Sequence, residues 1–282
     1  MRIAGSTVAI AGLGLIGGSL ARDLAAAGAR ILAFDRDVDS LRDALDAGVV
    51  HALMPPDFAG VEGADAFVLA LPVDVAPAAL IAAAPRLARV PLLTDVGSTK
   101  RSIVAAAERL GLGARFVGGH PLAGDHRAGW RAARAGLFAG ARVFLCPAAG
   151  ARDDAIERAR ALWLAVGARP EFIDAGAHDE RLAWASHLPQ AASSALARAL
   201  AAAGLRPTDL GPGGRDTTRL AASDPALWTA IALDNAPPIA AALERLETEL
   251  ATLRAALLRR DRDAVHAFFA AGRQWHEGAG ER

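Results

Sequence analysis

The sequence contains a single cysteine, Cys146, and a single lysine, Lys100, among 282 residues. One cysteine cannot build an internal disulfide framework, and this composition is typical of the reducing cytoplasm. Arginine replaces lysine almost everywhere, which looks like a genome-wide codon bias. The one retained lysine, in the motif DVGSTK, is therefore a candidate for a specific role. A solvated lysine at the start of a helix is the equal alternative.

An excess of charge of either sign is absent as well. Basic and acidic residues balance at 31 each, and the sequence pI is about 7.1. Such a chain has no global field that would attract nucleic acid or an anionic membrane surface. We therefore expect a small-molecule substrate, and neither a nucleic acid nor a membrane as partner.

Charged residues are also missing from residues 3–21, directly after Arg2. This pattern raises the alternative of a signal peptide or a membrane span. Four glycines argue against it, because each weakens a helix by about 1 kcal/mol relative to alanine. The segment also continues into a pattern typical of a folded domain, so we interpret it as part of that domain. The glycines are Gly12, Gly14, Gly17 and Gly18.

Short apolar runs alternate with helical patterns over the first half of the chain. Continuous apolar runs between helices indicate strands that are buried on both faces of a parallel sheet. The first helical pattern covers residues 15–28. The predicted strands lie within residues 7–14, 29–37, 65–73, 90–97, 114–121, 141–148 and 167–175.

The pattern changes after residue 175, where no strand signals remain. Residues 177–204 predict a long helix that Pro189 interrupts, and residues 224–278 predict two or three further helices. The predicted organisation is an α/β Rossmann-type nucleotide-binding domain over residues 1–175. An all-α domain follows over residues 176–282.

The motif GLGLIG, residues 12–17, follows the first predicted strand and opens the first helix. In this context the three glycines allow a tight turn, a close approach to a pyrophosphate and close helix–strand packing. Asp35, at the end of the second predicted strand, can bind the adenosine ribose hydroxyls and favours NAD. Arg36, directly after it, keeps NADP as an alternative, and a glycine-rich turn without ligand is the other. The predicted cofactor contacts are Gly12, Gly14, Leu15, Ile16, Gly17, Asp35, Arg36, Leu71, Pro72 and Ser98.

The motif GGHPLAGDHRAGW, residues 118–130, and the motif DVGSTK both follow predicted strands. Both can therefore lie at the carboxyl edge of the sheet, where open α/β folds bind ligands. His120 and His126 have no third ligand at metal-like spacing, so no metal site is predicted. An imidazole titrates near neutrality and can accept a proton from a hydroxyl while hydride leaves the same carbon. The alternative, a histidine that is hydrogen-bonded within its own loop, carries more weight for His126 than for His120.

Four motifs in order behind GLGLIG resemble the prephenate/arogenate dehydrogenase family of tyrosine biosynthesis. They are DVGSTK, GGHPLAG, SHLPQ and GGRDTTRLAASDPALW, and the resemblance covers about residues 8–235. It implies the oxidative decarboxylation of prephenate to 4-hydroxyphenylpyruvate, of arogenate to tyrosine, or of both, with hydride transfer to NAD(P). It also implies that the helical domain forms a homodimer.

The resemblance implies roles for individual residues. His120 would take the proton of the ring C4 hydroxyl, and Ser98 would hydrogen-bond the same hydroxyl near the nicotinamide. Arg219 would bind a substrate carboxylate, which suits a planar guanidinium, and Arg215 would assist it as a pocket cation, with a position across a dimer interface as one option. His187 and Gln190, both in SHLPQ, would lie near the substrate.

Two departures from the family pattern bear on the substrate. Gln190 stands where the family commonly has a second histidine, and His126 stands where an acidic residue is frequent. Loss of the acid disfavours the ammonium group of arogenate, which favours prephenate. A glutamine cannot become cationic and would hold an anionic group less tightly, so the choice of substrate stays open.

The helical domain has a leucine stripe that would suit a dimer interface or, equally, an intrachain core helix. No added segment at either end is long enough for a further catalytic or regulatory domain, which predicts a monofunctional enzyme. The leucines are Leu243, Leu246, Leu250, Leu253 and Leu257.

Two rival interpretations remain. Another two-domain NAD(P)-dependent dehydrogenase, acting on a β-hydroxyacid or an imine, would use a lysine in the first helix of the second domain, and AHDERLAWASHLPQ has none. A non-catalytic nucleotide sensor would lack the proton acceptor or the substrate arginine, whereas His120 and Arg219 are both present.

Overall fold

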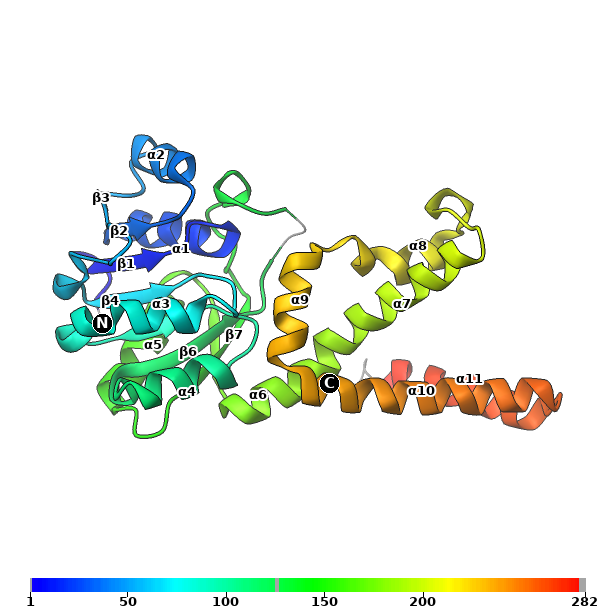
Figure 1. The fold of residues 1–282 in the computed structure, drawn as a ribbon. Helices are drawn as coiled ribbons and strands as arrows, with labels where there is room; N and C mark the ends of the chain where they lie inside the picture. Colours follow the sequence, from blue (N-terminus) through cyan, green and yellow to red (C-terminus); the bar gives the residue numbers. More distant parts are fainter. Residues whose placement is uncertain (1, 125–126, 279–282) are drawn as a thin grey trace.

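The computed structural model describes residues 2–124 and 127–278, which form a sheet domain followed by a helical part (Figure 1). The sheet has eight strands in the order β3-β2-β1-β4-β5-β6-β7-β8. All seven stretches that the sequence predicts as strands contain one, and β3 adds a short strand that no apolar run indicated. The bounds are β1 Thr7–Ala11, β2 Arg30–Phe34, β3 Ala52–Leu53, β4 Ala66–Leu69, β5 Leu93–Asp95, β6 Phe116–Pro121, β7 Arg142–Pro147 and β8 Arg169–Phe172.

The sheet is mixed, so the prediction of a wholly parallel sheet was wrong at one edge. Strands from β3 to β6 pair in parallel, but β6 pairs antiparallel with β7, with His120 opposite Phe144. The described part of the β6–β7 connection contains only a short 3₁₀ turn, Trp130–Ala132, and no crossover helix that would return the chain in parallel. Burial on both faces is common to both pairings, so the apolar runs did not distinguish them.

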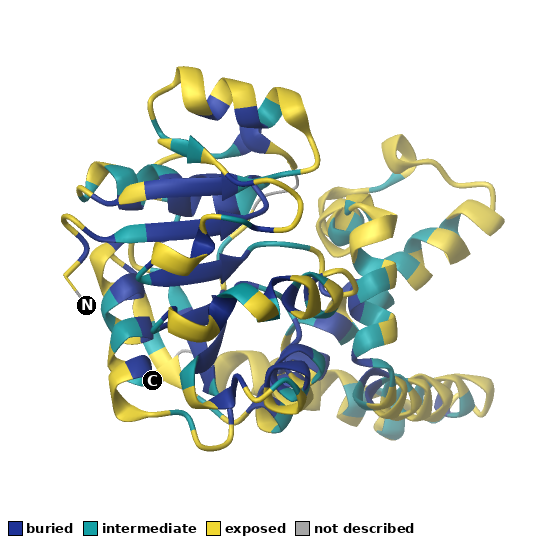
Figure 2. Ribbon diagram, turned by 60° about the vertical axis from the view of Figure 1, so that its left-hand side comes forward, coloured by how far each residue is buried: buried dark blue, intermediate teal, exposed yellow. Residues whose placement is uncertain are grey.

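Helices cover both faces of the sheet, and its strands are dark with burial in Figure 2. On β4, Val68 belongs to the apolar cluster on one face, whereas Phe67 and Leu69 belong to the cluster on the other. This alternation follows from the period of two along a strand and explains why the run is apolar throughout. The covering helices are α1 Leu15–Ala26, α2 Val38–Asp46, α3 Ala76–Ala83, α4 Arg101–Arg109 and α5 Asp153–Ala165.

Helices alone form the chain after β8. The predicted long helix consists of α6, one π-helical turn (Ala183–His187) and α7, and the π turn ends just before Pro189, whose nitrogen has no hydrogen to donate. The three helices α9, α10 and α11 fall where two or three were expected. Helix α8 was not predicted, because GGRDTT combines glycine and threonine, which are weak helix formers. The bounds are α6 Ala175–Leu182, α7 Leu188–Ala202, α8 Pro212–Thr218, α9 Pro225–Asp234, α10 Ala236–Leu258 and α11 Arg262–Glu277.

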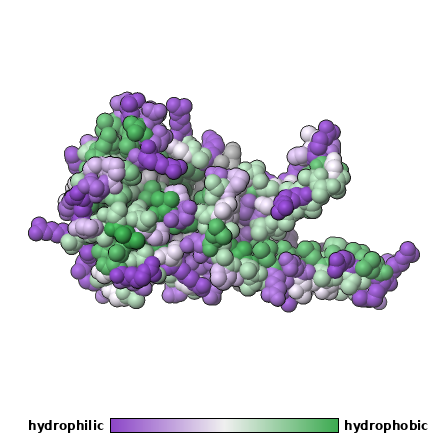
Figure 3. Space-filling model, in the orientation of Figure 1, coloured by the Kyte–Doolittle hydropathy of each residue, from purple (hydrophilic) through white to green (hydrophobic). Residues whose placement is uncertain are grey.

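Helices α10 and α11 project from the body of the molecule as an arm (Figure 1). None of the five stripe leucines is buried, and the side chains of Leu250 and Leu257 are each 55% exposed. The interpretation as an intrachain core helix is therefore wrong for Leu250 and Leu257, whereas the other three leucines are partly buried. Apolar residues lie along this arm in Figure 3. Across the described residues, no helix is both long enough and apolar enough to cross a membrane.

Candidate active site

The turn between β1 and α1 leaves space for a ligand. A Cβ on Gly12, which has φ +99°, would lie 2.2 Å from the carbonyl oxygen of Ala70, and a Cβ on Gly17 would lie 2.0 Å from the oxygen of Gly12. Gly14, in contrast, has no atom within 4 Å of its Cβ position, and as the N-cap of α1 it offers no side chain to the first-turn amides. Uncapped amides at a helix start are a site for an anion such as a pyrophosphate. This turn therefore fits the diphosphate of a dinucleotide.

Asp35 lies beside this turn, directly after β2. Its Oδ2 accepts a hydrogen bond from the amide of Leu13 at 2.6 Å, and its Oδ1 accepts from the amide of Asp37 at 2.8 Å. The carboxylate is thus fixed next to the glycine turn, where the ribose of a bound dinucleotide would lie. Arg36 is exposed beside it. Of the other predicted contacts, Leu15, Ile16 and Leu71 are partly buried and Pro72 is exposed.

The lysine of DVGSTK is completely buried, so the alternative of a solvated Lys100 was wrong. Its Nζ forms an ion pair with Oδ2 of Asp95, a residue that is itself buried. Asp95 also accepts hydrogen bonds from the amides of Gly97 (2.8 Å) and Gly119 (3.2 Å). A Cβ on Gly119 would lie 2.7 Å from the backbone oxygen of Asp95, and one on Gly118 would lie 3.1 Å from Cδ of Lys100. The two glycines before His120 therefore make room for this pair, which locks the two motifs together.

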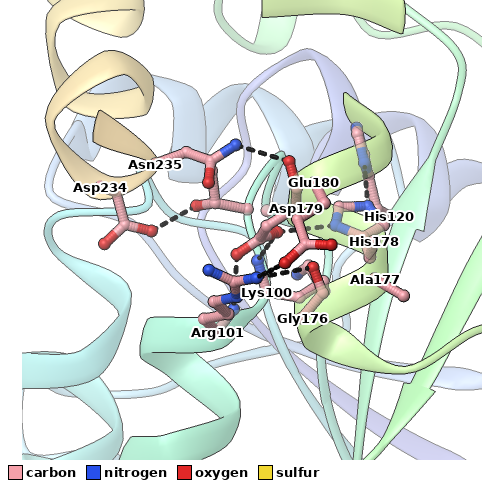
Figure 4. Close-up of polar contacts among 12 residues, drawn as sticks. Lys100, Arg101, His120, Gly176, Ala177, His178, Asp179, Glu180, Asp234 and Asn235 are labelled. Atoms are coloured by element: carbon pink, nitrogen blue, oxygen red, sulfur yellow. Dashed lines mark hydrogen bonds and ion pairs between the residues drawn. The ribbon is translucent and has the colours of Figure 1, made fainter. Parts of the chain in front are cut away.

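His120 lies at the carboxyl end of β6 and faces the helical part of the chain. Its Nδ1 lies 2.9 Å from Nε2 of His178, and Nδ1 of His178 lies 2.8 Å from Oδ1 of Asp179 (Figure 4). Within the described residues, Nε2 of His120 makes no hydrogen bond. Burial holds the pKa of His120 well below 6.5, and the nearby His178, Lys100 and His187 act in the same direction. His120 is therefore neutral at pH 7, and its partner lies in a helix, not in its own loop.

Asp179 joins several parts of the site. Its Oδ1 accepts from the amide of Lys100 at 2.8 Å and its Oδ2 from that of Arg101 at 2.9 Å, so it caps the start of α4. Asn235 donates through Nδ2 to the backbone oxygen of Asp179 (2.8 Å) and lies 3.1 Å from Nδ1 of His187. Burial raises the pKa of Asp179, but hydrogen bonds from His178 and the two amides outweigh it and hold the pKa below the usual value. Burial also lowers the pKa of His187 to about 4.

A second carboxylate from the helices holds the same loop. Asp234, at the end of α9, accepts hydrogen bonds from the hydroxyls of Thr99 and of Ser102, the latter at 2.8 Å. Ser98, directly before Thr99 in the chain, is partly buried. Its hydroxyl makes no hydrogen bond to any residue that the structure describes, so it can bind a ligand.

Two of the predicted substrate residues on the helices differ in burial: Gln190 is buried and Arg219 is exposed. The buried Gln190 donates through Nε2 to the carbonyl oxygen of Leu220 at 2.8 Å and accepts through Oε1 from the hydroxyl of Ser223 at 3.3 Å. The side chain of Arg219 is 72% exposed, and its Nε lies 3.9 Å from Oδ1 of Asp216. Gln190 is thus engaged in holding the segment next to Arg219.

Neither predicted arginine joins the polar network around His120. Arg215, on α8, is exposed and donates to the carbonyl oxygen of Leu210 at 2.6 Å. His187 packs edge-on against the ring of Trp228, with ring centroids 5.9 Å apart. His126 lies outside the described residues. The structure therefore joins His187 to the polar network of His120 through Asn235 and Asp179, but not the two arginines; among the described residues, no hydrogen bond links Ser98 to that network.

Sequence reasoning missed His178, Asp179, Asp234 and Asn235. The adjacent pair His178–Asp179 in AHDER was the available signal. No group of three or more His, Cys, Asp or Glu in the described part of the chain could hold a metal ion.

A dinucleotide turn and a neutral imidazole at one edge of a sheet are the requirements of a nucleotide-dependent dehydrogenase, with the helical part completing the site. Comparison with family models agrees. Residues 20–172 match the prephenate dehydrogenase nucleotide-binding domain, and residues 174–271 match the prephenate dehydrogenase dimerization domain. The chain belongs to the prephenate dehydrogenase family.

Individual relatives lead to the same family. The prephenate dehydrogenase of Bacillus subtilis (strain 168) is 32% identical over 96% of this chain and 76% of its own length. The cyclohexadienyl dehydrogenase of Zymomonas mobilis is 33% identical over 93% of this chain and 92% of its own. The crystal structure of A. aeolicus prephenate dehydrogenase in complex with hydroxyphenyl propionate and NAD+ is 29% identical, with a TM-score of 0.86 over 98% of this chain and 99% of that one.

Proposed function

We propose that this enzyme oxidises and decarboxylates prephenate, arogenate or both, with hydride transfer to NAD. The observation that carries the proposal is His120, a neutral imidazole whose Nε2 makes no hydrogen bond within the described residues and which lies at the carboxyl edge of the sheet. The family membership and the relatives that act on such substrates support it.

The cofactor would lie across the glycine turn. Gly12, Gly14 and Gly17 would admit its diphosphate, with Leu15 and Ile16 at the start of α1, and Asp35 would bind the adenosine ribose. A carboxylate there repels a 2′-phosphate, which favours NAD, while the exposed Arg36 keeps NADP as the second choice. When bound, the oxidised nicotinamide supplies the hydride acceptor beside Leu71, Pro72 and Ser98.

The residues of the chain would move one proton and hold one hydroxyl. Nε2 of His120 accepts the proton of the C4 hydroxyl as the C4 carbonyl forms and hydride leaves C4. The bond between C1 and the ring carboxylate then breaks, and its electrons pass through the ring to the C4 oxygen as CO₂ leaves and the ring becomes aromatic. The C4 oxygen takes back the proton from His120, which restores the phenol hydroxyl and the neutral base. Ser98 donates a hydrogen bond to the C4 oxygen. The enzyme therefore supplies positioning and one base.

Substrate recognition would come from the helical part. Arg219 would bind a carboxylate, with Arg215 as an assisting cation, and His187 would lie near the ring. We propose that Gln190 acts on the substrate through the segment that it holds, and that His126 borders the same pocket. The single lysine, Lys100, is buried against Asp95, which gives no support to a lysine-dependent dehydrogenase of the β-hydroxyacid or imine type.

We further propose two domains, residues 1–175 and 176–282, and a homodimer formed through the second. The exposed leucines of α10 and the match to a dimerization domain support the dimer. We propose a cytoplasmic location, because a chain with one cysteine, Cys146, cannot build an internal disulfide framework.

The test is the formation of reduced nicotinamide by purified protein with prephenate or arogenate, each with NAD or NADP. Turnover of either acid with NAD is expected, and the ratio of kcat/KM values assigns the preferred acid. No turnover in any of the four combinations, with NAD binding intact, would contradict the proposal.

A further inference from the structure

The hydrogen bonds around His178 determine which nitrogen of each ring carries hydrogen. The carboxylate of Asp179 accepts from two backbone amides and has a lowered pKa, so it is ionised and can only accept. Nδ1 of His178 must therefore carry the hydrogen. Burial lowers the pKa of His178, which keeps the ring neutral. Its Nε2 then has a lone pair, and Nδ1 of His120, 2.9 Å away, must be the donor.

We propose that His178 and Asp179 are positioning residues that hold His120 in the tautomer with hydrogen on Nδ1 and a free lone pair on Nε2. That lone pair is the one that accepts the substrate proton, so the inference rests on the proposed function for its chemical purpose. The order of donors runs from His120 to His178 to Asp179.

Asp179 is well suited to this task because it cannot rotate. Both carboxylate oxygens are held by the amides of Lys100 and Arg101, and its backbone oxygen is held by Asn235. In Figure 4 it lies beside His178 and the start of α4, and the rings of His178 and His120 meet edge to face. The same contacts join the helical part to the nucleotide-binding sheet, so the orientation of His120 depends on correct docking of the two parts.

The second histidine of the site has the opposite tautomer. The Nδ2 of Asn235 has two hydrogens, and its two acceptors are the backbone oxygen of Asp179 and Nδ1 of His187. Nδ1 of His187 therefore has the lone pair, and its hydrogen is on Nε2. One network thus presents an acceptor at His120 and a donor at His187.

The network also stabilises the proton after transfer. A cation on His120 would donate through Nδ1 to His178, which donates in turn to ionised Asp179. The other charged group facing the rings, Lys100, is neutralised by Asp95. From the sheet side, His178 packs against the uncharged ring of Phe144, with ring centroids 5.5 Å apart, and the guanidinium groups of Arg142 and Arg181 lie over that same ring.

Asp179→Asn tests the charge at the end of the chain. Oδ1 of Asp179 accepts from both the Lys100 amide and Nδ1 of His178, so the asparagine oxygen would take that position and its NH₂ group would face the Arg101 amide. The direction of the chain is then kept, but the cation that forms on His120 loses its carboxylate. A hydrogen bond to a charged group is worth about 1.5–3 kcal/mol, so we expect kcat to fall by about 10–10² with unchanged NAD affinity. The matched control is Asp174→Asn, because the Asp174 side chain caps α6 and makes no hydrogen bond to a histidine ring among the described residues; its kcat should stay within about twofold.

His178→Phe separates positioning from a merely structural role. It removes the acceptor for His120 but keeps Asp179 on its two amides, and kcat should fall by about 10–10². Adding Asp179→Asn should then cause no further loss of kcat, because no chain of hydrogen bonds remains between residue 179 and His120. Multiplicative losses in the double variant would overturn the proposal.

The decisive experiment is ¹⁵N NMR of histidine-labelled protein without substrate at neutral pH, with resonances assigned by single variants. We expect the nitrogen without hydrogen to be Nε2 in His120 and Nδ1 in His187, and we expect hydrogen to appear on Nε2 of His120 in His178→Phe, which offers Nδ1 of His120 no acceptor. Hydrogen on Nε2 of wild-type His120, or no change in His178→Phe, would overturn the proposal. Because this readout needs no turnover, an inactive protein with the expected tautomers would disprove the proposed function and leave this inference intact.

Discussion

The loop pair around His120, formed by the motifs DVGSTK and GGHPLAG, differs from the segment around Arg219 in how far contacts within the chain fix its side chains. Around His120, buried groups from the sheet and from three helices are joined by hydrogen bonds and by the Lys100–Asp95 pair. Arg219 is exposed, and its segment is held by the amide of Gln190. The proton-transfer half of the site is therefore preorganised, whereas the carboxylate-binding half leaves its cation open to a ligand.

The largest effect should come from the base itself. His120→Asn removes the acceptor at Nε2, and we expect kcat to fall by about 10²–10⁴ while NAD affinity is unchanged. Steady-state kinetics and cofactor titration measure the two quantities. Wild-type turnover in this variant would remove His120 as the base and with it the contrast between the two halves.

The buried pair should matter for stability more than any exposed pair. Lys100→Met leaves Asp95 uncompensated inside the protein, which should lower the free energy of unfolding by about 3–5 kcal/mol. Denaturant unfolding measures this loss. The control is Arg206→Ala, which removes an exposed pair with Asp209 and should cost less than about 1 kcal/mol. Equal losses in the two variants would show that the Lys100–Asp95 ion pair does not hold the loops around His120 in place.

The open half should respond through KM. Arg219→Ala removes a charged hydrogen-bond donor, which is worth about 1.5–3 kcal/mol, so KM for the substrate should rise about 10- to 100-fold with a smaller change in kcat. Arg245→Ala, an exposed arginine paired with Glu249 on α10, is the matched control. An unchanged KM in Arg219→Ala would mean that another cation binds the carboxylate.

A smaller effect should come from the residue that holds this segment. Gln190→Met keeps the volume but loses the hydrogen bonds to Leu220 and Ser223, and we expect KM to rise about 3- to 10-fold. In an Arg219→Ala background the same change should add nothing, because Gln190 acts through the arginine. A full additional rise in the double variant would instead indicate direct contact between Gln190 and the substrate.

The same comparison shows what the sequence could predict. The strands, the glycine turn and the position of His120 follow from local patterns, because apolar runs and GLGLIG have a fixed relation to a sheet edge. The bond from His120 to His178 spans 58 positions, and no periodicity reports such a contact. The buried state of Lys100 depends on space that two glycines of another strand provide, and the direction of β7 depends on a connection without a crossover helix. Those features belong to the packed structure.

The most direct test of the account is the pH dependence of kcat/KM for the wild type and His120→Asn. The active form of His120 is neutral, and burial holds its pKa well below 6.5. Activity should therefore be level around neutral pH and fall only as the pH drops through that lowered pKa, and the acid limb should vanish in His120→Asn. A limb that lies above 6.5, or one that persists in His120→Asn, would contradict a buried neutral His120 as the catalytic base.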